Sequence, residues 1–193
     1  MSAVTRKISH GPISYEQNYT YEEWLEMENP EGIAKLELID GKLYAMAAPG
    51  TAHQSILAEL IRQFTNYLIG KRCRLYPGIG VRLAKDTVYI PDMVVVCDPN
   101  KINERGCEGA PDLIIEILSP SNIRHDRATK MKAYRRAGVK EYWIVDPENY
   151  SVEVYSLVNE MYVLDVYEKI DKTMPVKAIP DFEIDLSTVF RED

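Results

Sequence analysis

Two carboxylates interrupt apolar segments in which a charged side chain is costly to bury. Asp92 follows Pro91 and opens the run Asp92–Cys97, and Glu116 lies inside the run Leu113–Leu118. An ionised carboxylate in such a run costs several kcal/mol unless it is paired or bound to a cation. Two acids side by side on adjacent strands would form a site for a hard divalent cation. Mg²⁺ binds one or two carboxylates and leaves positions open for a phosphate, so the pair points to metal-assisted phosphate chemistry.

Each candidate residue also has a purely structural interpretation. An acid at the start of a strand, like Asp92, is common as a turn or capping residue. Glu116 could be paired with a buried Arg or Lys instead of a metal ion. Glu37 lies on the polar side of an alternating strand, and His53 lies near the start of a helix. Lys130 falls in the second or third turn of a basic helix, where a lysine is ordinarily a surface residue.

The elements that must position these residues alternate between strands and helices. Strands are predicted at Lys35–Ile39, Lys42–Ala47, Arg72–Tyr76, Ile79–Leu83, Val88–Cys97, Asp112–Leu118, Glu141–Val145, Ser151–Leu157 and Met161–Tyr167. Helices are predicted at Thr20–Glu28, at Ala52–Ile69 and from about Ser121 to Ala137, with a short turn near Leu186–Phe190. A glycine-containing loop is predicted at Asn103–Pro111.

This order predicts an α/β fold with a mixed central sheet flanked by helices, and with hairpins near both ends. Asp40-Gly41 is the turn signal of the first hairpin. The segment Asp112–Leu118 is apolar enough to be buried on both faces of the sheet. We expect residues 1–19 to form an irregular arm and residues 20–193 to form a single domain.

Composition excludes several classes of protein. A net charge of −7 argues against a protein that coats nucleic acid non-specifically, although seven basic residues cluster between Arg124 and Lys140. The three cysteines are odd in number and show no paired CxxC spacing, which argues against a disulfide framework or a zinc site. No secretory signal and no apolar run of membrane-spanning length is visible. We therefore expect a cytoplasmic protein without a membrane partner.

An ordered series of segments resembles the Uma-two family of predicted endonucleases, within the PD-(D/E)XK superfamily of restriction-endonuclease-like nucleases. The resemblance runs from about Tyr19 to Phe190. The segments that carry it are Leu36-Glu37-Leu38-Ile39-Asp40-Gly41, His53, Ile90-Pro91-Asp92-Met93-Val94-Val95, Ile115-Glu116-Ile117-Leu118-Ser119-Pro120-Ser121, Asp126-Arg127, Lys130, Tyr134-Arg135-Arg136-Ala137-Gly138-Val139 and Glu141-Tyr142-Trp143-Ile144-Val145-Asp146-Pro147.

The resemblance implies a restriction-endonuclease-like core with a divalent metal site, holding Mg²⁺ or Mn²⁺. The implied ligands are Asp92, Glu116, the main-chain carbonyl of Ile117 and Glu37, with His53 and Asp126 as accessory residues. The chain departs from the superfamily pattern at Leu118, where the general motif has a lysine. Similarity to relatives with a relocated lysine implies that Lys130 supplies that charge from the following helix.

The working hypothesis is metal-dependent hydrolysis of phosphodiester bonds in nucleic acid, with DNA as the expected partner. Asp92 and Glu116 would hold the metal with help from Glu37, and Lys130 would orient the water or stabilise the transition state. Four basic residues are the candidates for positioning backbone phosphates: Arg124, Arg127, Lys132 and Arg135. Restriction-type nucleases cut both strands by dimerising, so a homo-oligomer is expected from the resemblance.

The alternative is a nuclease-fold protein that does not cleave and acts as a nucleic-acid-binding or regulatory module. Leu118 favours it, whereas the joint presence of Asp92, Glu116, Glu37 and Lys130 disfavours it. A zinc hydrolase of small molecules is disfavoured because the chain lacks a histidine cluster. The hairpin at Ser151–Tyr167 carries three tyrosines that fit either a subunit contact or ordinary sheet packing.

Overall fold

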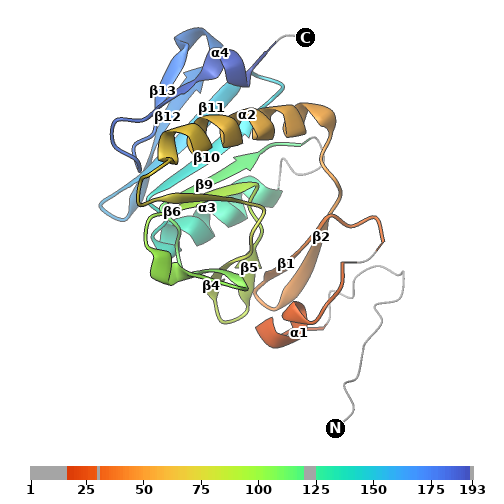
Figure 1. The fold of residues 1–193 in the computed structure, drawn as a ribbon. Coiled ribbons are helices and arrows are strands. Elements are labelled where there is room, and N and C mark those ends of the chain that lie inside the picture. The colour runs from red at the N-terminus through yellow and green to blue at the C-terminus, as the bar shows by residue number, and fades with distance from the viewer. Residues whose placement is uncertain (1–16, 30, 120–124, 192–193) are drawn as a thin grey trace.

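Two mixed six-stranded sheets form the framework of the chain (Figure 1). The computed structural model describes residues 17–29, 31–119 and 125–191, and of residues 125–128 the backbone alone. The central sheet has the spatial order β12 (Met161–Glu168), β11 (Ser151–Val158), β10 (Glu141–Asp146), β9 (Leu113–Ile117), β6 (Met93–Val96) and β3 (Arg74–Pro77). The outer sheet has the order β2 (Lys42–Met46), β1 (Lys35–Ile39), β5 (Thr87–Tyr89), β4 (Val81–Ala84), β8 (Gly106–Glu108) and β7 (Ile102–Asn103).

The central sheet lies between helices α2 (Thr51–Leu68) and α3 (His125–Ala137), one on each face (Figure 1). Side chains of α2 pack on one face, where Phe64 contacts Trp143. On the other face Tyr134 of α3 packs against Tyr142. The apolar residues of β9 are buried on both faces, as the apolar run predicts, and Glu116 alone in this strand is partly exposed. This double cover confirms the predicted α/β arrangement, in which β9 and β10 are parallel.

The predicted single strand Val88–Cys97 is wrong, because the chain changes sheets in the middle of it. Residues 87–89 belong to the outer sheet and residues 93–96 to the central sheet. Pro91 has no N–H to continue a strand ladder. The amide of Ile90 donates to the carboxylate of Glu37 at 2.8 Å. The segment Ile90-Pro91-Asp92 is therefore the connection between the two sheets.

Both predicted hairpins are present. In the β1–β2 turn, Asp40 and Gly41 have φ angles of 49° and 76°, the left-handed region that such a turn requires. In the second hairpin, β11 pairs with β12 along the whole of both strands. Tyr155 and Tyr162 pack with the α3 face of the central sheet, and Tyr167 packs with the α2 face. Subunit contact through this hairpin stays a prediction.

The remaining elements are short. They are α1 (Tyr21–Leu25), α4 (Leu186–Val189), the 3₁₀ turns Pro99–Lys101 and Lys169–Asp171, and the paired strands β13 (Thr173–Pro175) and β14 (Glu183–Asp185). The predicted loop Asn103–Pro111 instead contains the last residue of β7 and the whole of β8. A Cβ at Gly106 would lie 2.2 Å from the carbonyl oxygen of Gly80, so this approach of the two backbones requires glycine. In the described part of the chain, no helix combines the length and apolarity needed to cross a membrane.

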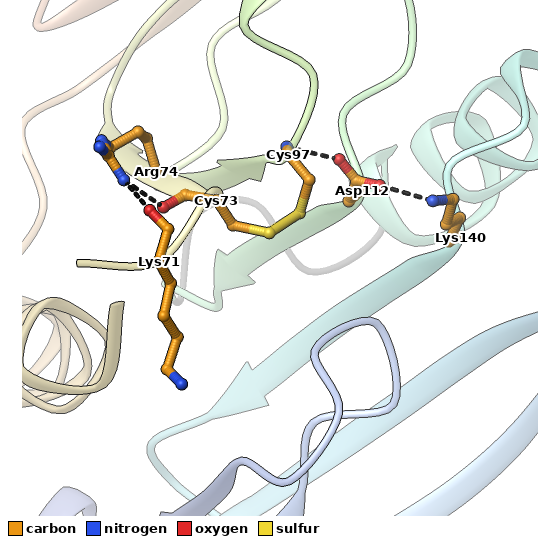
Figure 2. The surroundings of a disulfide bond; sticks show 6 residues. All are labelled: Lys71, Cys73, Arg74, Cys97, Asp112 and Lys140. Carbon is orange, nitrogen blue, oxygen red and sulfur yellow. Dashed lines mark hydrogen bonds and ion pairs between the residues drawn. A yellow bond between two sulfur atoms is a disulfide. The ribbon is translucent and has the colours of Figure 1, made fainter. Parts of the chain in front are cut away.

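The expectation that the cysteines are unpaired was wrong. Cys73 and Cys97 form a disulfide with their Cα atoms 3.9 Å apart (Figure 2). Cys73 directly precedes β3 and Cys97 directly follows β6, and the antiparallel register of these strands places the two residues opposite each other. Asp112 accepts a hydrogen bond from the amide of Cys97 and one from Lys140 (Figure 2). Because two of the three cysteines are paired, the cysteines no longer indicate a reducing cytoplasm.

This disulfide closes a sequence separation of 24 residues. We predict that dithiothreitol lowers the free energy of unfolding by about 3 kcal/mol, because reduction frees the unfolded chain. Urea unfolding with and without reductant measures the difference. The denatured, unreduced protein should expose one thiol, that of Cys107, and three after reduction. Three thiols before reduction, or equal unfolding midpoints, would contradict the disulfide.

Candidate active site

Asp92 and Glu116 lie opposite each other where β6 and β9 begin to diverge. The register Met93–Ile115 and Val94–Ile114 makes Asp92 and Glu116 the next facing pair. Facing residues of antiparallel strands project their side chains to the same side of the sheet. The two carboxylates therefore share one face of the sheet, next to α3 and to the outer-sheet strand β1.

Asp92 is enclosed by hydrogen-bond donors from three elements. Its Oδ1 accepts from Lys35 Nζ at 2.6 Å. Its Oδ2 lies 3.0 Å from His53 Nε2 and accepts from the amide of Ile117 at 2.9 Å. Burial raises the pKa of Asp92, but the hydrogen bond of His53 and the charge of Lys35 outweigh burial and lower it below the ordinary aspartate value. Asp92 is therefore a charged acceptor at neutral pH.

Glu116 has a different environment. Its Oε1 accepts from Lys130 Nζ at 3.0 Å and from the hydroxyl of Tyr134 at 2.9 Å. Burial raises the pKa of Glu116 to about 7, against the opposing charge of Lys130 and with a further contribution from Asp92. Additional positive charge near Glu116 would therefore stabilise its ionised form.

Lys130 joins the two sheets through Glu37. Its ammonium group lies 3.2 Å from Glu37 Oε1 of the outer sheet and 3.0 Å from Glu116 of the central sheet. Both Lys130 and Glu37 are 1% exposed. The sequence placed Glu37 on the polar side of its strand, and this side is turned inward against α3. A buried lysine between two carboxylates satisfies the pairing requirement for a charge in the interior.

A small cavity of about 50 Å³ borders the two carboxylates. Lys35, His53, Asp92, Glu116 and Ile117 line it, and Lys130 does not. A volume of this size holds an ion with one or two waters, since a single water needs about 10–15 Å³ by the same measure. A nucleotide cannot enter such a cavity, so a phosphate would have to approach its mouth.

The structure brings together Glu37, Asp92, Glu116, Lys130, His53 and Ile117 from the predicted site. Lys132 is exposed, and its position two residues from the inward-facing Lys130 places it on the opposite side of α3. Arg135 contacts the sulfur of Met161. Arg124 lies outside the described residues, and so do the side chains of Asp126 and Arg127.

Two residues of the site were missed from the sequence. Lys35 is two positions before Glu37 on a strand, so the period of a strand places both side chains on one face. Tyr134 is four positions after Lys130 on a helix, which also places both on one face. The periodicity was thus available as a signal. The sequence could not show which face would contact the carboxylates, because that depends on how the two sheets pack together.

The site fits a divalent cation in ligand type. Carboxylate and main-chain oxygens are the ligands that Mg²⁺ and Mn²⁺ prefer. The carboxylates of Glu37, Asp92 and Glu116 are paired in this structure with Lys35, Lys130 and His53. Among the described residues, no group of three or more His, Cys, Asp and Glu side chains is already arranged as a metal site. The two lysines lie among the carboxylates, so the ligands are present but not arranged for a metal.

Comparison with known proteins gives a consistent family and fold. The Uma2 family, described as "Putative restriction endonuclease", matches residues 20–187. Uncharacterized protein slr1290 of Synechocystis sp. is 28% identical over 151 residues, which are 77% of this chain and 79% of that protein. A crystal structure of "a putative nuclease belonging to DUF820" from Anabaena variabilis superposes with a TM-score of 0.74 at 23% identity. That match covers 89% of this chain and 97% of the other. The predicted nuclease-type α/β fold is confirmed.

The ion pairs of Lys130 lead to a stability prediction. Lys130→Met leaves Glu37 and Glu116 buried without their shared cation, so we expect the free energy of unfolding to fall by about 3–5 kcal/mol. Chemical denaturation at neutral pH measures this change. The matched control is Lys132→Met on the exposed side of the same helix, which should stay within about 0.5 kcal/mol of the wild type. Equal losses in both variants would contradict a special role of Lys130.

Proposed function

The chain belongs to the Uma2 family, and from this premise we propose that it is a divalent-metal-dependent endonuclease that hydrolyses phosphodiester bonds of DNA. The observation that carries the proposal is that Asp92 and Glu116, each one position beyond the last paired residues Met93 and Ile115, both border a cavity of ion size. Carboxylate oxygens beside a cavity of this size are the ligands that a hard divalent cation prefers.

In this proposal the metal is held by Asp92, Glu116 and the main-chain carbonyl of Ile117. A Mg²⁺ or Mn²⁺ ion held by these residues would supply an activated water and positive charge beside the phosphate. The chain itself orients the ligands. His53 and the amide of Ile117 fix Oδ2 of Asp92, and Lys130 together with Tyr134 fixes Oε1 of Glu116.

Glu37 and Lys130 support the site from behind the cavity. Glu37 accepts a hydrogen bond from the amide of Ile90, two residues before Asp92. This bond holds in place the segment between the two sheets that carries Asp92. Lys130 is buried and does not border the cavity, so its role in the proposal is to keep Glu116 ionised and oriented. In this proposal Lys130 reaches Glu116 from α3 without reaching the cavity, so it positions Glu116 and does not orient the water as the sequence-based hypothesis expected.

Substrate binding in this proposal rests on backbone phosphate contacts at the surface. The cavity admits no base, and the chain is acidic overall. Contacts to phosphate position nucleic acid without reading its sequence. Lys132 and Arg135 of α3 are the described residues that we assign to this role. Metal and DNA binding are expected to be coupled, because an acidic site repels a polyanion until a cation neutralises it.

The non-cleaving alternative has one observation in its favour. Each carboxylate of the facing pair already has a lysine partner, and a chain with Leu118 in place of the motif lysine need not bind metal at all. In that case the acidic cluster serves only to join the two sheets. The two functions differ in metal binding and in cleavage, both of which are measurable on the same protein.

The central prediction concerns cleavage. With Mg²⁺ or Mn²⁺ we expect the wild type to nick supercoiled plasmid, EDTA to stop it, and added metal to restore it. Asp92→Asn and Glu116→Gln should each reduce nicking by about a hundredfold or more, because each removes a charged ligand. Glu148→Gln, at an exposed acid, is the matched control. A folded wild type that neither binds metal nor nicks would favour the non-cleaving module.

A second prediction concerns phosphate contacts. Binding of the Glu116→Gln variant to duplex DNA should weaken as salt increases, because phosphate contacts release counterions. Adding Lys132→Ala should reduce the slope of log affinity against log salt by about 1. Adding Lys42→Ala, on the first hairpin, should leave the slope unchanged. Equal slopes for all three proteins would remove Lys132 from the interface.

A further inference from the structure

The two oxygens of Asp92 are held in different ways. Oδ2 meets two donors that have little freedom, the ring of His53 and the main-chain amide of Ile117. Oδ1 meets Lys35, whose ammonium group also donates to the carbonyl oxygen of Ile90 at 3.1 Å. Both oxygens of this proposed metal ligand are therefore already engaged. Oδ1 accepts from one donor and Oδ2 meets two, so a lone pair for a metal remains on Oδ1. A metal bound to Oδ1 would lie beside the Lys35 ammonium group, and the two positive charges would repel each other.

Lys35 is the donor that can move. Its side chain is 22% exposed, whereas that of His53 is 7% exposed. It is the first residue of β1 and borders the cavity beside Asp92. A lysine side chain has a flexible four-carbon stem and a strongly hydrated ammonium group, so water can replace its contacts when it withdraws toward solvent. The amide of Ile117 cannot withdraw without moving β9.

We propose that Lys35 is the internal counter-ion of the metal site, and that a divalent cation binds by displacing its ammonium group from Oδ1 of Asp92. The inference rests on the proposed function, since it names what the metal competes with. Lys35 keeps the buried carboxylate paired while no metal is bound. It thereby lowers the affinity for metal, because two cations compete for one oxygen.

Lys130 does not compete in the same way. It is 1% exposed, does not border the cavity, and lies between Glu37 and Glu116. Replacing it would remove a buried pair and change stability. Replacing Lys35 removes a partly exposed competitor beside the cavity. The two lysines therefore give opposite expectations for metal affinity, which separates competition from mere support of the fold.

The test measures binding of Mn²⁺ alone, without DNA, by isothermal titration calorimetry on the full chain. The variants are Lys35→Met, which removes the charge, and Lys35→Gln, which keeps one hydrogen-bond donor without the charge. Lys35→Arg keeps the charge, and Lys42→Met changes an exposed lysine of the same hairpin. Near-ultraviolet circular dichroism checks that each protein is folded.

Lys35→Met and Lys35→Gln are expected to bind Mn²⁺ about tenfold more tightly than the wild type, within the usual range for coupled sites. Lys35→Arg and Lys42→Met should stay within about threefold of the wild type. If Lys35 instead only supported the fold of the site, its replacement would weaken Mn²⁺ binding. If one neutral variant does not fold, the other decides the result.

Two outcomes overturn the proposal and differ in meaning. If the wild type binds Mn²⁺ and the folded neutral variants bind it equally or more weakly, Lys35 is not a competitor, and the proposed endonuclease function stands. If the folded wild type and all variants bind no Mn²⁺, the metal-dependent function fails and the inference fails with it.

Discussion

The structure depends on how its buried carboxylates are paired. Glu37, Asp92 and Glu116 come from three separate segments. Glu37 and Asp92 are buried and Glu116 is partly buried, so each needs a positive partner. Lys130 of α3 forms ion pairs with two of them, Glu37 and Glu116. Lys35, on the same strand as Glu37, forms an ion pair with Asp92. The ion pairs that hold the two sheets together therefore also bring the residues of the candidate site together.

This arrangement explains why the site lies between sheets and not within one. The connection Ile90-Pro91-Asp92 leaves the outer sheet, and its first amide is taken by Glu37 instead of by a strand. Proline ends the ladder, and Asp92 then starts beside Glu116 as the central sheet begins. A strand that continued through this segment would have placed Asp92 in a ladder. The change of sheet leaves the carboxylate beside a cavity.

The sequence predicted what local pattern determines. Asp40-Gly41 identified a hairpin, the spacing of Ile56, Leu60 and Phe64 identified a helix, and two acids in apolar runs identified a candidate site. It could not predict what depends on register between distant segments. The disulfide requires β3 and β6 to pair so that Cys73 meets Cys97. Likewise, Lys35 gains its importance only because β1 lies against the connection that carries Asp92.

Anomalous X-ray diffraction from crystals grown with Mn²⁺ would locate the bound ion. If Asp92 and Glu116 form the metal centre, one anomalous peak lies between their carboxylates, within bonding distance of both, at about 2.0–2.3 Å. The peak should disappear in crystals of Glu116→Gln grown under the same conditions. A peak at another site alone, or an unchanged peak in that variant, would contradict a metal centre built on these two acids.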